Sequence, residues 1–464
     1  MRDRTDRRPA RGTLISLAIV ASALASSGPA VAGGGATQPN VLIVLTDDQR
    51  LSGTMAVLPH VERWFGKGGR TFDRGYVPTP LCCPSRATIL TGRYAHNHGV
   101  KENGANGRRA LDHSTTIERY LQDAGYRTAI FGKFFNFWRV RDDPPYFDRW
   151  GIVTPSRTSN GYRGGTWNLQ GDLRTVNRYS TTFLAARAER LIRSGENDDA
   201  RPWFMEIATY APHSVAIPDR AYRHARVGAF RPNPAMTESD RRDKPPTVRA
   251  ENASLEAMEL TRERQLRTLM SVDDLVADVA STLRRTDESR DTLAFFLSDN
   301  GVSWGEHGAR AKSYPYDPDV RIPFFMRWPG RVRGSTSEGH LTSTVDVAPT
   351  ILDAAGIEQD PAVPMDGRSL LGGPQTRRHA LLEFWPWVGS SAPEWAAVVS
   401  KRYEYTEYYA RDGSIVFREF YALRRDRWQL TNVLHDGDRR NDPDVRRLHA
   451  RLQEDRVCVG SGCP

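Results

Sequence analysis

Four apolar runs of the sequence each end in polar or charged residues, and this pattern constrains the fold more than any other feature. The runs are NVLIVLTDD (40–48), YRTAIFGK (126–133), PWFMEIATYAPH (202–213) and TLAFFLSDN (292–300). Continuous apolar stretches of this kind are typical of strands that are buried on both faces of a parallel sheet. Amphipathic helical patterns, such as the one over 255–287, lie between them. The sequence therefore predicts an α/β protein with a large, mostly parallel sheet flanked by helices.

The N-terminal segment has a different character. Five arginines and two aspartates are followed by the apolar stretch TLISLAIVASALA (13–25) and by Ala30-Val31-Ala32. This layout is typical of a secretory signal peptide over residues 1–32. The apolar stretch is too short and too interrupted for a stable membrane span. We therefore expect a secreted or cell-envelope protein with no stable membrane association.

The charge of the chain favours an anionic substrate. The formal net charge of the 464 residues is +9, and it falls to +6 without the five arginines and two aspartates of the first 32 residues. No block of Lys and Arg with interleaved aromatic residues is present, so nucleic acid is not expected as a partner. Mild basicity suits a sulfated or phosphorylated sugar.

Changes in composition predict the domain organisation. Segments rich in Gly, Pro and Arg at 151–178 and 216–251 are interpreted as surface loops. A further change near 356–378 divides a catalytic domain, 38–375, from a smaller C-terminal α+β domain, 376–464. Hairpin strands are expected within 403–423, followed by a terminal helix.

Two of the four cysteines are adjacent in the sequence. Cys458 and Cys463 can close a small disulfide loop in an oxidising compartment. A bridge between Cys82 and Cys83 would need a strained ring and is not expected. Neither a disulfide nor packing explains why the chain carries Cys82 and Cys83 side by side.

The polar ends of the four runs predict a site. In an open α/β sheet, ligands bind beyond the carboxyl ends of the strands. The residues there are Asp47, Asp48, Lys133, His213, Asp299 and Asn300. Each alone is compatible with a turn, a helix cap or a solvated side chain, but together they suggest one site at a sheet edge.

The chemistry of these side chains is consistent with an anionic ester as substrate. The aspartates and the asparagine offer only oxygen ligands, which favours Ca²⁺ or Mg²⁺ over zinc. Lys133, His213 and a further lysine, Lys312, can neutralise an oxyanion and protonate a leaving group. A nucleophile is the missing part of this site.

The segment CCPSRATILTGR (82–93) resembles the signature of the type I sulfatases, C-x-P-S-R-x-x-x-L-T-G-R, whose fold is of the alkaline phosphatase type. Further blocks resemble this family in the same order: TDDQ (46–49), FGK (131–133), APH (211–213), SDNG (298–301) and KSYPYD (312–317). The resemblance spans nearly all of the chain after the signal segment. Details such as LCCPSR, HNHGV and GKFFN are similar to the branch of N-acetylglucosamine-6-sulfatases and heparan endosulfatases.

The resemblance implies a nucleophile and a metal. Cys82 would be oxidised to formylglycine by a formylglycine-generating enzyme, and Cys83 would fill the free position of the motif. Ca²⁺ would be held by Asp47, Asp48, Asp299, Asn300 and the modified Cys82. One hydroxyl of the aldehyde hydrate, a gem-diol, would attack sulfur, and the other would let the carbonyl re-form with release of sulfate.

The resemblance also implies roles for the remaining side chains. Arg86 would steady the formylglycine hydrate, Lys133 and Lys312 would bind sulfate oxygens, and His213 would assist departure of the leaving group. Three further residues, His98, Asn103 and Asn136, are candidates for substrate contact. For His98 and Asn103 the alternative is structural support of the signature helix, and for Asn136 it is packing of the FFNF run.

Several functions are compatible with this sequence. The first is hydrolysis of a sulfated sugar of the N-acetylglucosamine 6-sulfate type, free or at the end of a glycosaminoglycan fragment. A small-molecule or oligosaccharide sulfate ester is thus the expected partner. A phosphoric or phosphonic ester hydrolase, or a broad arylsulfatase, would use the same site, and an inactive carbohydrate-binding relative is the alternative of another class.

Overall fold

All four apolar runs form neighbouring strands at the centre of one large sheet. In the computed structural model of the protein, they are β1 (Asn40–Thr46), β3 (Arg127–Gly132), β7 (Trp203–Ala208) and β8 (Thr292–Ser298). Their order in the sheet is β8-β1-β7-β3, and all three pairings are parallel. The prediction of parallel, doubly buried strands is confirmed.

The structure describes residues 38–154, 161–195, 201–372, 377–387 and 390–464. The expected signal peptide, residues 1–32, lies outside the described residues. Within the described part of the chain, no helix combines the length and the apolar character that a membrane span requires.

Six further strands extend the sheet to ten, in the order β10-β2-β9-β8-β1-β7-β3-β4-β5-β6. On one side lie β9 (Phe324–Arg327), β2 (Arg70–Tyr76) and β10 (Thr336–Ser343). On the other lie β4 (Arg149–Thr154), β5 (Thr166–Leu169) and β6 (Asp172–Thr175). The interpretation of 151–178 as surface loop was therefore wrong. These short strands belong to the sheet margin, where pairing does not need a continuous apolar run.

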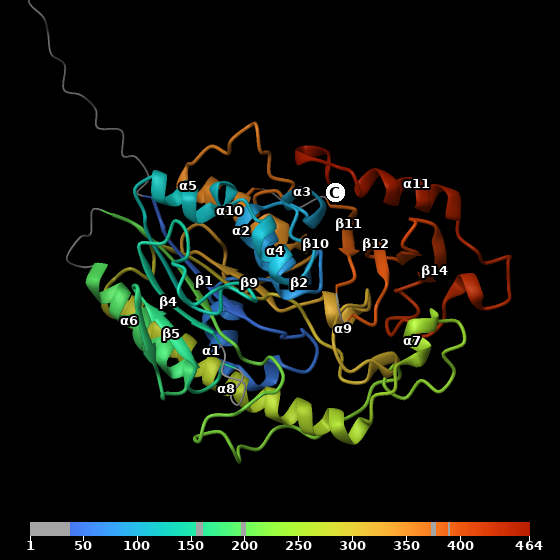
Figure 1. The fold of residues 1–464 in the computed structure, drawn as a ribbon, viewed down its shortest axis with the longest axis horizontal. Coiled ribbons are helices and arrows are strands. Elements are labelled where there is room, and N and C mark those ends of the chain that lie inside the picture. The colour runs from blue at the N-terminus through green and yellow to red at the C-terminus, as the bar shows by residue number, and fades with distance from the viewer. Residues whose placement is uncertain (1–37, 155–160, 196–200, 373–376, 388–389) are drawn as a thin grey trace, which may run out of the picture. The chain divides into compact units, whose positions relative to one another are not determined.

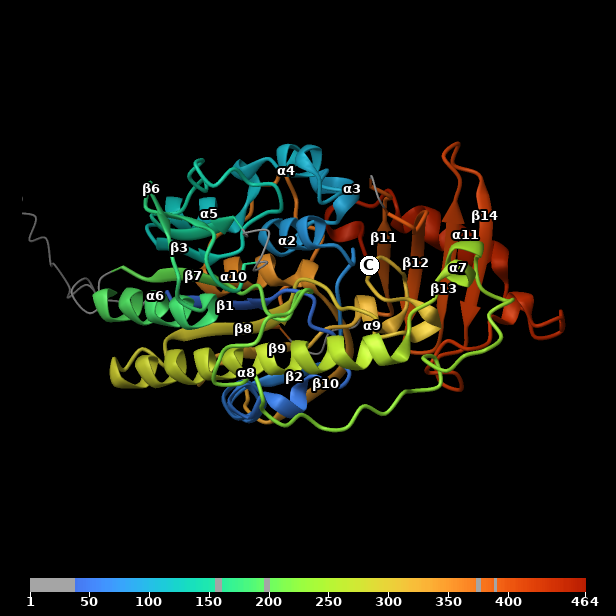
Figure 2. The same ribbon diagram turned by 60° about the horizontal axis from the view of Figure 1, so that its bottom comes forward.

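Helices cover both faces of this sheet. Leu42 and Val44 of β1 pack on one face with α6 (Ser180–Gly195) and α8 (Leu255–Arg285). Val41, Ile43 and Leu45 pack on the other face with α2, α5 and α10, whose bounds are Cys82–Thr91, Ile117–Asp123 and Val347–Ala355. Figure 2 shows α8 on one side of the sheet and α2 and α5 on the other. The amphipathic pattern over 255–287 is one long helix, α8.

Shorter helices complete the architecture. They are α1 (Pro59–Val61), α3 (Ala95–His98), α4 (Ala105–Ala110), α7 (Pro246–Ala250), α9 (Asp317–Val320) and α11 (Val445–Asp455). Single helical turns lie at Met55–Val57, Glu62–Lys67, His113–Thr115, Glu306–Gly308, Thr344–Asp346, Val433–His435 and Gly460–Gly462. Most of 216–245 forms no helix or strand, as expected for a surface loop.

A second, antiparallel sheet follows in the C-terminal part of the chain (Figure 1). Its strands are β11 (His379–Phe384), β12 (Glu394–Ser400), β13 (Glu404–Tyr409) and β14 (Ile415–Tyr421), in sequential order. The expected hairpin within 403–423 and the terminal helix, α11, are both confirmed. After α11, Cys458 and Cys463 form a disulfide, whereas Cys82 and Cys83 are free thiols.

Candidate active site

The carboxyl ends of β1 and β8 bring two pairs of polar residues together. Thr46 at the end of β1 is in register with Ser298 at the end of β8, so Asp47-Asp48 and Asp299-Asn300 follow at the same level of the sheet. All four side chains are buried. The parallel pairing of β1 with β8 thus brings together residues that are about 250 positions apart in the sequence.

Hydrogen bonds fix the two pairs relative to each other. The Asp48 N–H donates to Asp299 Oδ1 at 3.1 Å, and Asn300 Nδ2 donates to Asp48 Oδ1 at 2.6 Å. Asp48 has a φ of 67°, a left-handed conformation that is unusual for an aspartate. Strained backbone of this kind is typical of functional sites, where the surroundings must hold it in place.

Cys82 enters this site from the first residue of α2. Its Sγ lies 3.6 Å from Asp47 Oδ1 and accepts a hydrogen bond from Lys312 Nζ at 2.9 Å. The thiol is fully buried. Burial raises the pKa of Cys82 to about 11, although Lys133 and Lys312 partly oppose the shift. At neutral pH the side chain is therefore a thiol and not a thiolate.

Two lysines pair with the aspartates after β1. Lys133, which follows β3, contacts Asp47, and Lys312 contacts Asp48. Lys312 Nζ also donates to Asn300 Oδ1 at 3.2 Å. Burial by itself would raise the pKa of both aspartates, but the nearby cations, with a lysine the strongest in each case, hold each pKa below its ordinary value.

Arg86 lies one turn along α2 from Cys82 and pairs with the aspartate after β8. Its Nη2 lies 2.9 Å from Asp299 Oδ2, and its Nε donates to the same oxygen at 3.0 Å. Its Nη1 donates to the carbonyl of Lys133 at 3.0 Å. Arg86 thereby connects α2 to the ends of β8 and β3.

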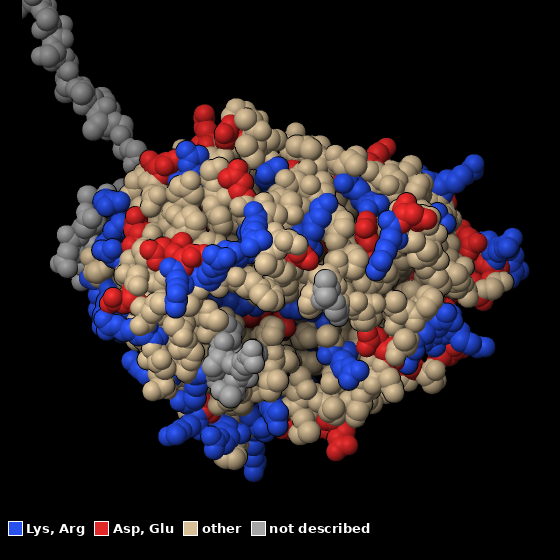
Figure 3. All heavy atoms as spheres, viewed as in Figure 1, with Lys and Arg blue, Asp and Glu red and all other residues tan. Residues whose placement is uncertain are grey.

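His213 lies at the solvent side of the site. It follows β7, and its Nε2 is 3.7 Å from Asp48 Oδ2. Its side chain is 29% exposed and that of Lys312 is 12% exposed, whereas Asp47 is completely buried. In the view of Figure 3 the molecule is hollowed near its middle, with acidic and basic side chains visible inside.

The structure places the three candidate substrate residues around α2. Asn103 Oδ1 accepts the Cys83 N–H at 2.8 Å, and the Asn136 N–H donates to Cys83 Sγ at 3.2 Å. His98 is 5% exposed, with Nε2 3.1 Å from Thr88 Oγ1 and Nδ1 accepting the Val100 N–H. Both ring nitrogens of His98 are therefore used within the protein.

One pair of residues near the site was not identified from the sequence. Arg50 donates to both carboxylate oxygens of Glu306, at 3.0 and 2.6 Å, and both side chains are almost completely buried. The guanidinium also stacks on Trp304 at 4.5 Å. This pair joins the segment after β1 to the segment after β8. Arg50 directly follows the TDDQ block, and this position could have marked it as a candidate site residue. No sequence spacing pointed to Glu306 as its partner.

The donor set fits a hard divalent cation. The ligand atoms of Asp47, Asp48, Cys82 and His213 lie within 4.8 Å of one another, and Asp299 and Asn300 adjoin them. Carboxylate and amide oxygens are the ligands that Ca²⁺ and Mg²⁺ prefer. Lys133 and Lys312 reach the same atoms, so an anion above Cys82 would meet two ammonium groups.

Comparison with models of protein families gives two matches. Residues 39–357, more than half of the chain, match the sulfatase family. Residues 305–457 match the C-terminal region of N-sulphoglucosamine sulphohydrolase. The second match covers the β11–β14 sheet and α11.

Two relatives illustrate the similarity in sequence. A putative extracellular sulfatase Sulf-1 homolog of Caenorhabditis elegans is 35% identical over 358 residues, which are 72% of this chain and 49% of that protein. This chain therefore spans about half the length of that relative. The human N-acetylglucosamine-6-sulfatase is 30% identical over 487 residues, which cover 92% of this chain and 86% of that protein.

A solved structure matches the fold. It is described as a complex with its substrate D-glucosamine-2-N,6-O-disulfate, and it has a TM-score of 0.79 at 20% sequence identity. The match covers 90% of this chain and 97% of that chain. The expected alkaline phosphatase-like fold with a small C-terminal antiparallel sheet is thereby confirmed.

Proposed function

The chain belongs to the sulfatase family, and from this premise we propose that it hydrolyses sulfate esters of sugars of the N-acetylglucosamine 6-sulfate type. The observation that carries the proposal is the convergence of Cys82 with three aspartates and two lysines at one sheet edge. Such a site combines a position for a nucleophile, ligands for a cation and donors for an anionic group.

The proposed metal ligands are the four residues after β1 and β8 together with the modified Cys82. A bound Ca²⁺ would supply Lewis-acid stabilisation of charge on the transferring group. The strained Asp48 and its hydrogen bonds hold two of the ligands in place before any cation binds. Lys133 and Lys312 contact the same aspartates, so these ammonium groups would have to shift when a cation binds.

Cys82 is proposed to act after conversion to formylglycine by a separate maturation enzyme. One hydroxyl of the hydrated aldehyde would attack sulfur and displace the sugar alkoxide, which takes up a proton. The other hydroxyl would then lose its proton and re-form the carbonyl, which breaks the C–O bond to sulfate and releases it. Arg86 is proposed to hold this side chain in position, since it is anchored on Asp299 and on the Lys133 carbonyl.

Three side chains are proposed to handle the substrate. Lys133 and Lys312 would bind the non-bridging sulfate oxygens, because both ammonium groups already lie beside Cys82 or its neighbour Asp47. His213, at the open side of the site, would protonate the leaving alkoxide. The two lysines would stabilise negative charge on the sulfate and His213 would supply a proton, both in the same transition state.

The substrate class and location are inferred from the relatives. One relative is named an N-acetylglucosamine-6-sulfatase and another an extracellular sulfatase homolog. We infer that this chain acts outside the cytoplasm on free or oligosaccharide-linked sulfated glucosamine. The residues of 38–375 would carry catalysis, with 376–464 as a supporting domain.

The test is release of free sulfate from N-acetylglucosamine 6-sulfate by protein from its native host. Paired aryl sulfate and aryl phosphate substrates are assayed in parallel, with Cys82→Ala as the control for contaminating enzymes. We expect the sugar sulfate to turn over and the aryl sulfate to be preferred to the aryl phosphate. Turnover of the phosphate alone, or of neither sulfate, would refute the proposal.

A further inference from the structure

A second hollow, distinct from the candidate active site, lies in the C-terminal part of the molecule. Its volume is about 1420 Å³, and its walls are the start of β11, the turn between β12 and β13, one face of α11 and residues 461–464. We call it the α11 groove. None of its lining residues belongs to the candidate active site.

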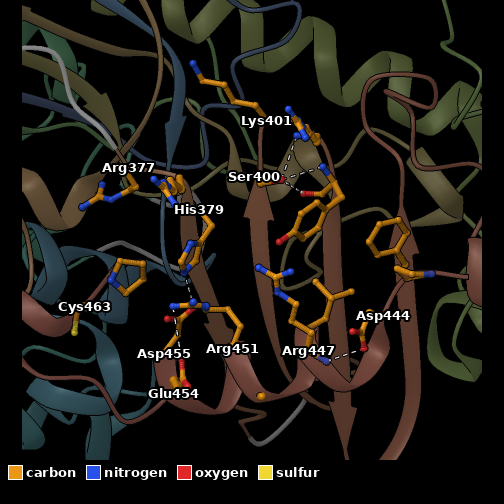
Figure 4. A pocket seen from close by; sticks show the side chains of 18 of the residues that line it. Arg377, His379, Ser400, Lys401, Asp444, Arg447, Arg451, Glu454, Asp455 and Cys463 are labelled. Carbon is orange, nitrogen blue, oxygen red and sulfur yellow. Dashed lines mark hydrogen bonds and ion pairs between the residues drawn. The ribbon is translucent and has the colours of Figure 1, made fainter.

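The α11 groove is strongly basic. Among the described residues that line it, eight arginine and lysine side chains accompany only three aspartates and glutamates. Arg447 and Arg451 lie one turn apart on α11 and both line the groove (Figure 4), where Arg451 Nη1 lies 3.6 Å from Glu454 Oε2. A concave surface with an excess of one charge concentrates ligands of the opposite charge.

Several of the groove's polar side chains are occupied by partners and form its fixed floor. Arg377 donates to both oxygens of Asp346, at 2.5 and 2.7 Å, and is almost completely buried. His379 Nε2 lies 2.8 Å from Asp455 Oδ2. These pairs neutralise one another and hold the start of β11 against α11.

Four exposed arginines of the groove form no such pairs within the described part of the chain. Arg378, Arg402, Arg424 and Arg447 are exposed, and none of their guanidinium groups has a hydrogen bond or ion pair with another described residue. The neighbouring residues 373–376, Gly-Pro-Gln-Thr, contain no carboxylate that could neutralise them. Four arginines therefore line the groove without a side-chain partner among the described residues.

We propose that the α11 groove binds a sulfated oligosaccharide outside the active site. The guanidinium fork matches the paired oxygens of a sulfate group, as it matches those of phosphate and carboxylate. The choice of a sulfated glycan among polyanions rests on the proposed function together with the shape and lining of the groove. The existence of a polyanion site rests on the groove alone.

The shape and lining of the groove distinguish a glycan from other polyanions. Its volume exceeds the roughly 300–1,000 Å³ of small-molecule sites, so it accommodates more than one sugar unit. The two aromatic rings that line it, Tyr403 and Phe420, stack on each other at 5.4 Å instead of forming a series of platforms for bases. A concave surface also fits a chain better than the plane of a membrane.

The β12 strand links the groove to the active site. Near its start, Trp395 Nε1 donates to the carbonyl of Ser313, the neighbour of Lys312, at 2.8 Å. At its end, Ser400 lines the groove. Five residues of strand correspond to about 17 Å. A sulfated chain held in the groove would raise the local concentration of substrate ends near the site.

The test compares two double variants of equal charge change. Arg424→Glu/Arg447→Glu alters the groove, and Arg63→Glu/Arg290→Glu alters two exposed arginines elsewhere that also have no ion pair with a described residue. Binding of a heparin-derived octasaccharide to the full chain is measured by calorimetry at several salt concentrations. The groove variant should lose about tenfold or more in affinity and show a weaker salt dependence, whereas the control should bind like wild type.

Activity separates this inference from the proposed function. Both variants should retain the wild-type kcat/KM for an aryl sulfate, which also shows that they are folded. Equal loss of octasaccharide binding in both variants, or none in either, would overturn the inference even if sulfatase activity is present. Displacement of the octasaccharide by an equimolar single-stranded DNA of the same charge would overturn the choice of a glycan.

Discussion

The two adjacent cysteines at the start of α2 differ in their surroundings. Cys82 Sγ faces Lys312 and Asp47, whereas Cys83 Sγ accepts the Asn136 N–H. Burial raises the pKa of Cys82 to about 11 and that of Cys83 to about 12. A thiol that stays protonated is a poor nucleophile. The unmodified cysteine therefore does not explain a catalytic role, which is consistent with conversion of Cys82.

Replacing each cysteine separately tests which of them is needed. Cys82→Ala should lower kcat for an aryl sulfate by a factor on the order of 10³ or more, because the proposed nucleophile is lost. Cys83→Ala should keep kcat within about threefold and cost roughly 1 kcal/mol of stability, since it removes one buried sulfur atom. Comparable losses of kcat in the two variants would contradict the assignment.

His98 is expected to make the fold sensitive to acid. Burial lowers the pKa of His98 to about 3, and protonation of Nδ1 would oppose its bond from the Val100 N–H. The unfolded chain takes up a proton near pH 6.5, so the free energy of unfolding falls as the pH drops from 6.5 towards 3. His98→Gln removes this dependence.

The measurement is urea unfolding at pH 6.5 and at pH 5. Wild type should lose roughly 1–2 kcal/mol more than His98→Gln over this interval. His224→Gln, at an exposed histidine, is the matched control and should follow wild type. Parallel pH profiles for wild type and His98→Gln would show that His98 does not titrate as inferred.

Among the secondary-structure elements, those with the strongest sequence patterns were the ones predicted. The strands β1, β3, β7 and β8 are continuous apolar runs because helices cover both of their faces. The marginal strands β4, β5 and β6 lack this signal, and β6 is exposed along its whole length. Their pairing depends on the neighbouring strand, which a local pattern does not contain.

The same distinction applies to the candidate site. Strand-end residues such as Asp47 and Asp299 could be proposed from position alone, since parallel strands end at one edge. Lys312 lies in no helix or strand and meets Asp48 across 264 residues, so its place at the site could not be derived from a strand end. The pairing of Arg50 with Glu306 and the α11 groove depend on tertiary packing, and no local pattern pointed to Glu306 or to the groove.

The disulfide after α11 is expected to contribute modestly to stability. It links residues five apart in sequence, and closing so short a loop is worth about 2 kcal/mol in the chain-entropy description. Cys458→Ser/Cys463→Ser should therefore lower the free energy of urea unfolding by about that amount. Dithiothreitol should lower wild type to the level of the variant and leave the variant unchanged. An effect of dithiothreitol on the variant would point to another cause.

On the scale of the whole molecule, the sheet order joins distant parts of the chain at one site. The Asp48 N–H donates a hydrogen bond to Asp299, which lies 251 residues later in the sequence. Lys133 contacts Asp47, which lies 86 residues earlier. A cation bound between the two strand ends would therefore stabilise only the completely folded protein. Metal binding and global stability should be coupled.

Calcium should accordingly raise the resistance to unfolding. At a hundredfold excess over its dissociation constant, Ca²⁺ should add about 2.7 kcal/mol to the free energy of unfolding, and a chelator should reverse the effect. Asp299→Asn should show a much smaller response, whereas Asp172→Asn, on the exposed strand β6, should respond like wild type. An equal response in all three proteins would place the cation elsewhere.

The deep burial of Cys82 also limits the period during which a modifying enzyme can reach it. Lys312, which covers its sulfur, follows it by 230 residues. A ribosome that adds about 5–20 residues per second needs roughly 10–50 s to make that segment. During this interval the cysteine has been synthesised but its covering lysine has not. An enzyme that modifies Cys82 has that period for access, and a chain that folds before it is modified would have to open again.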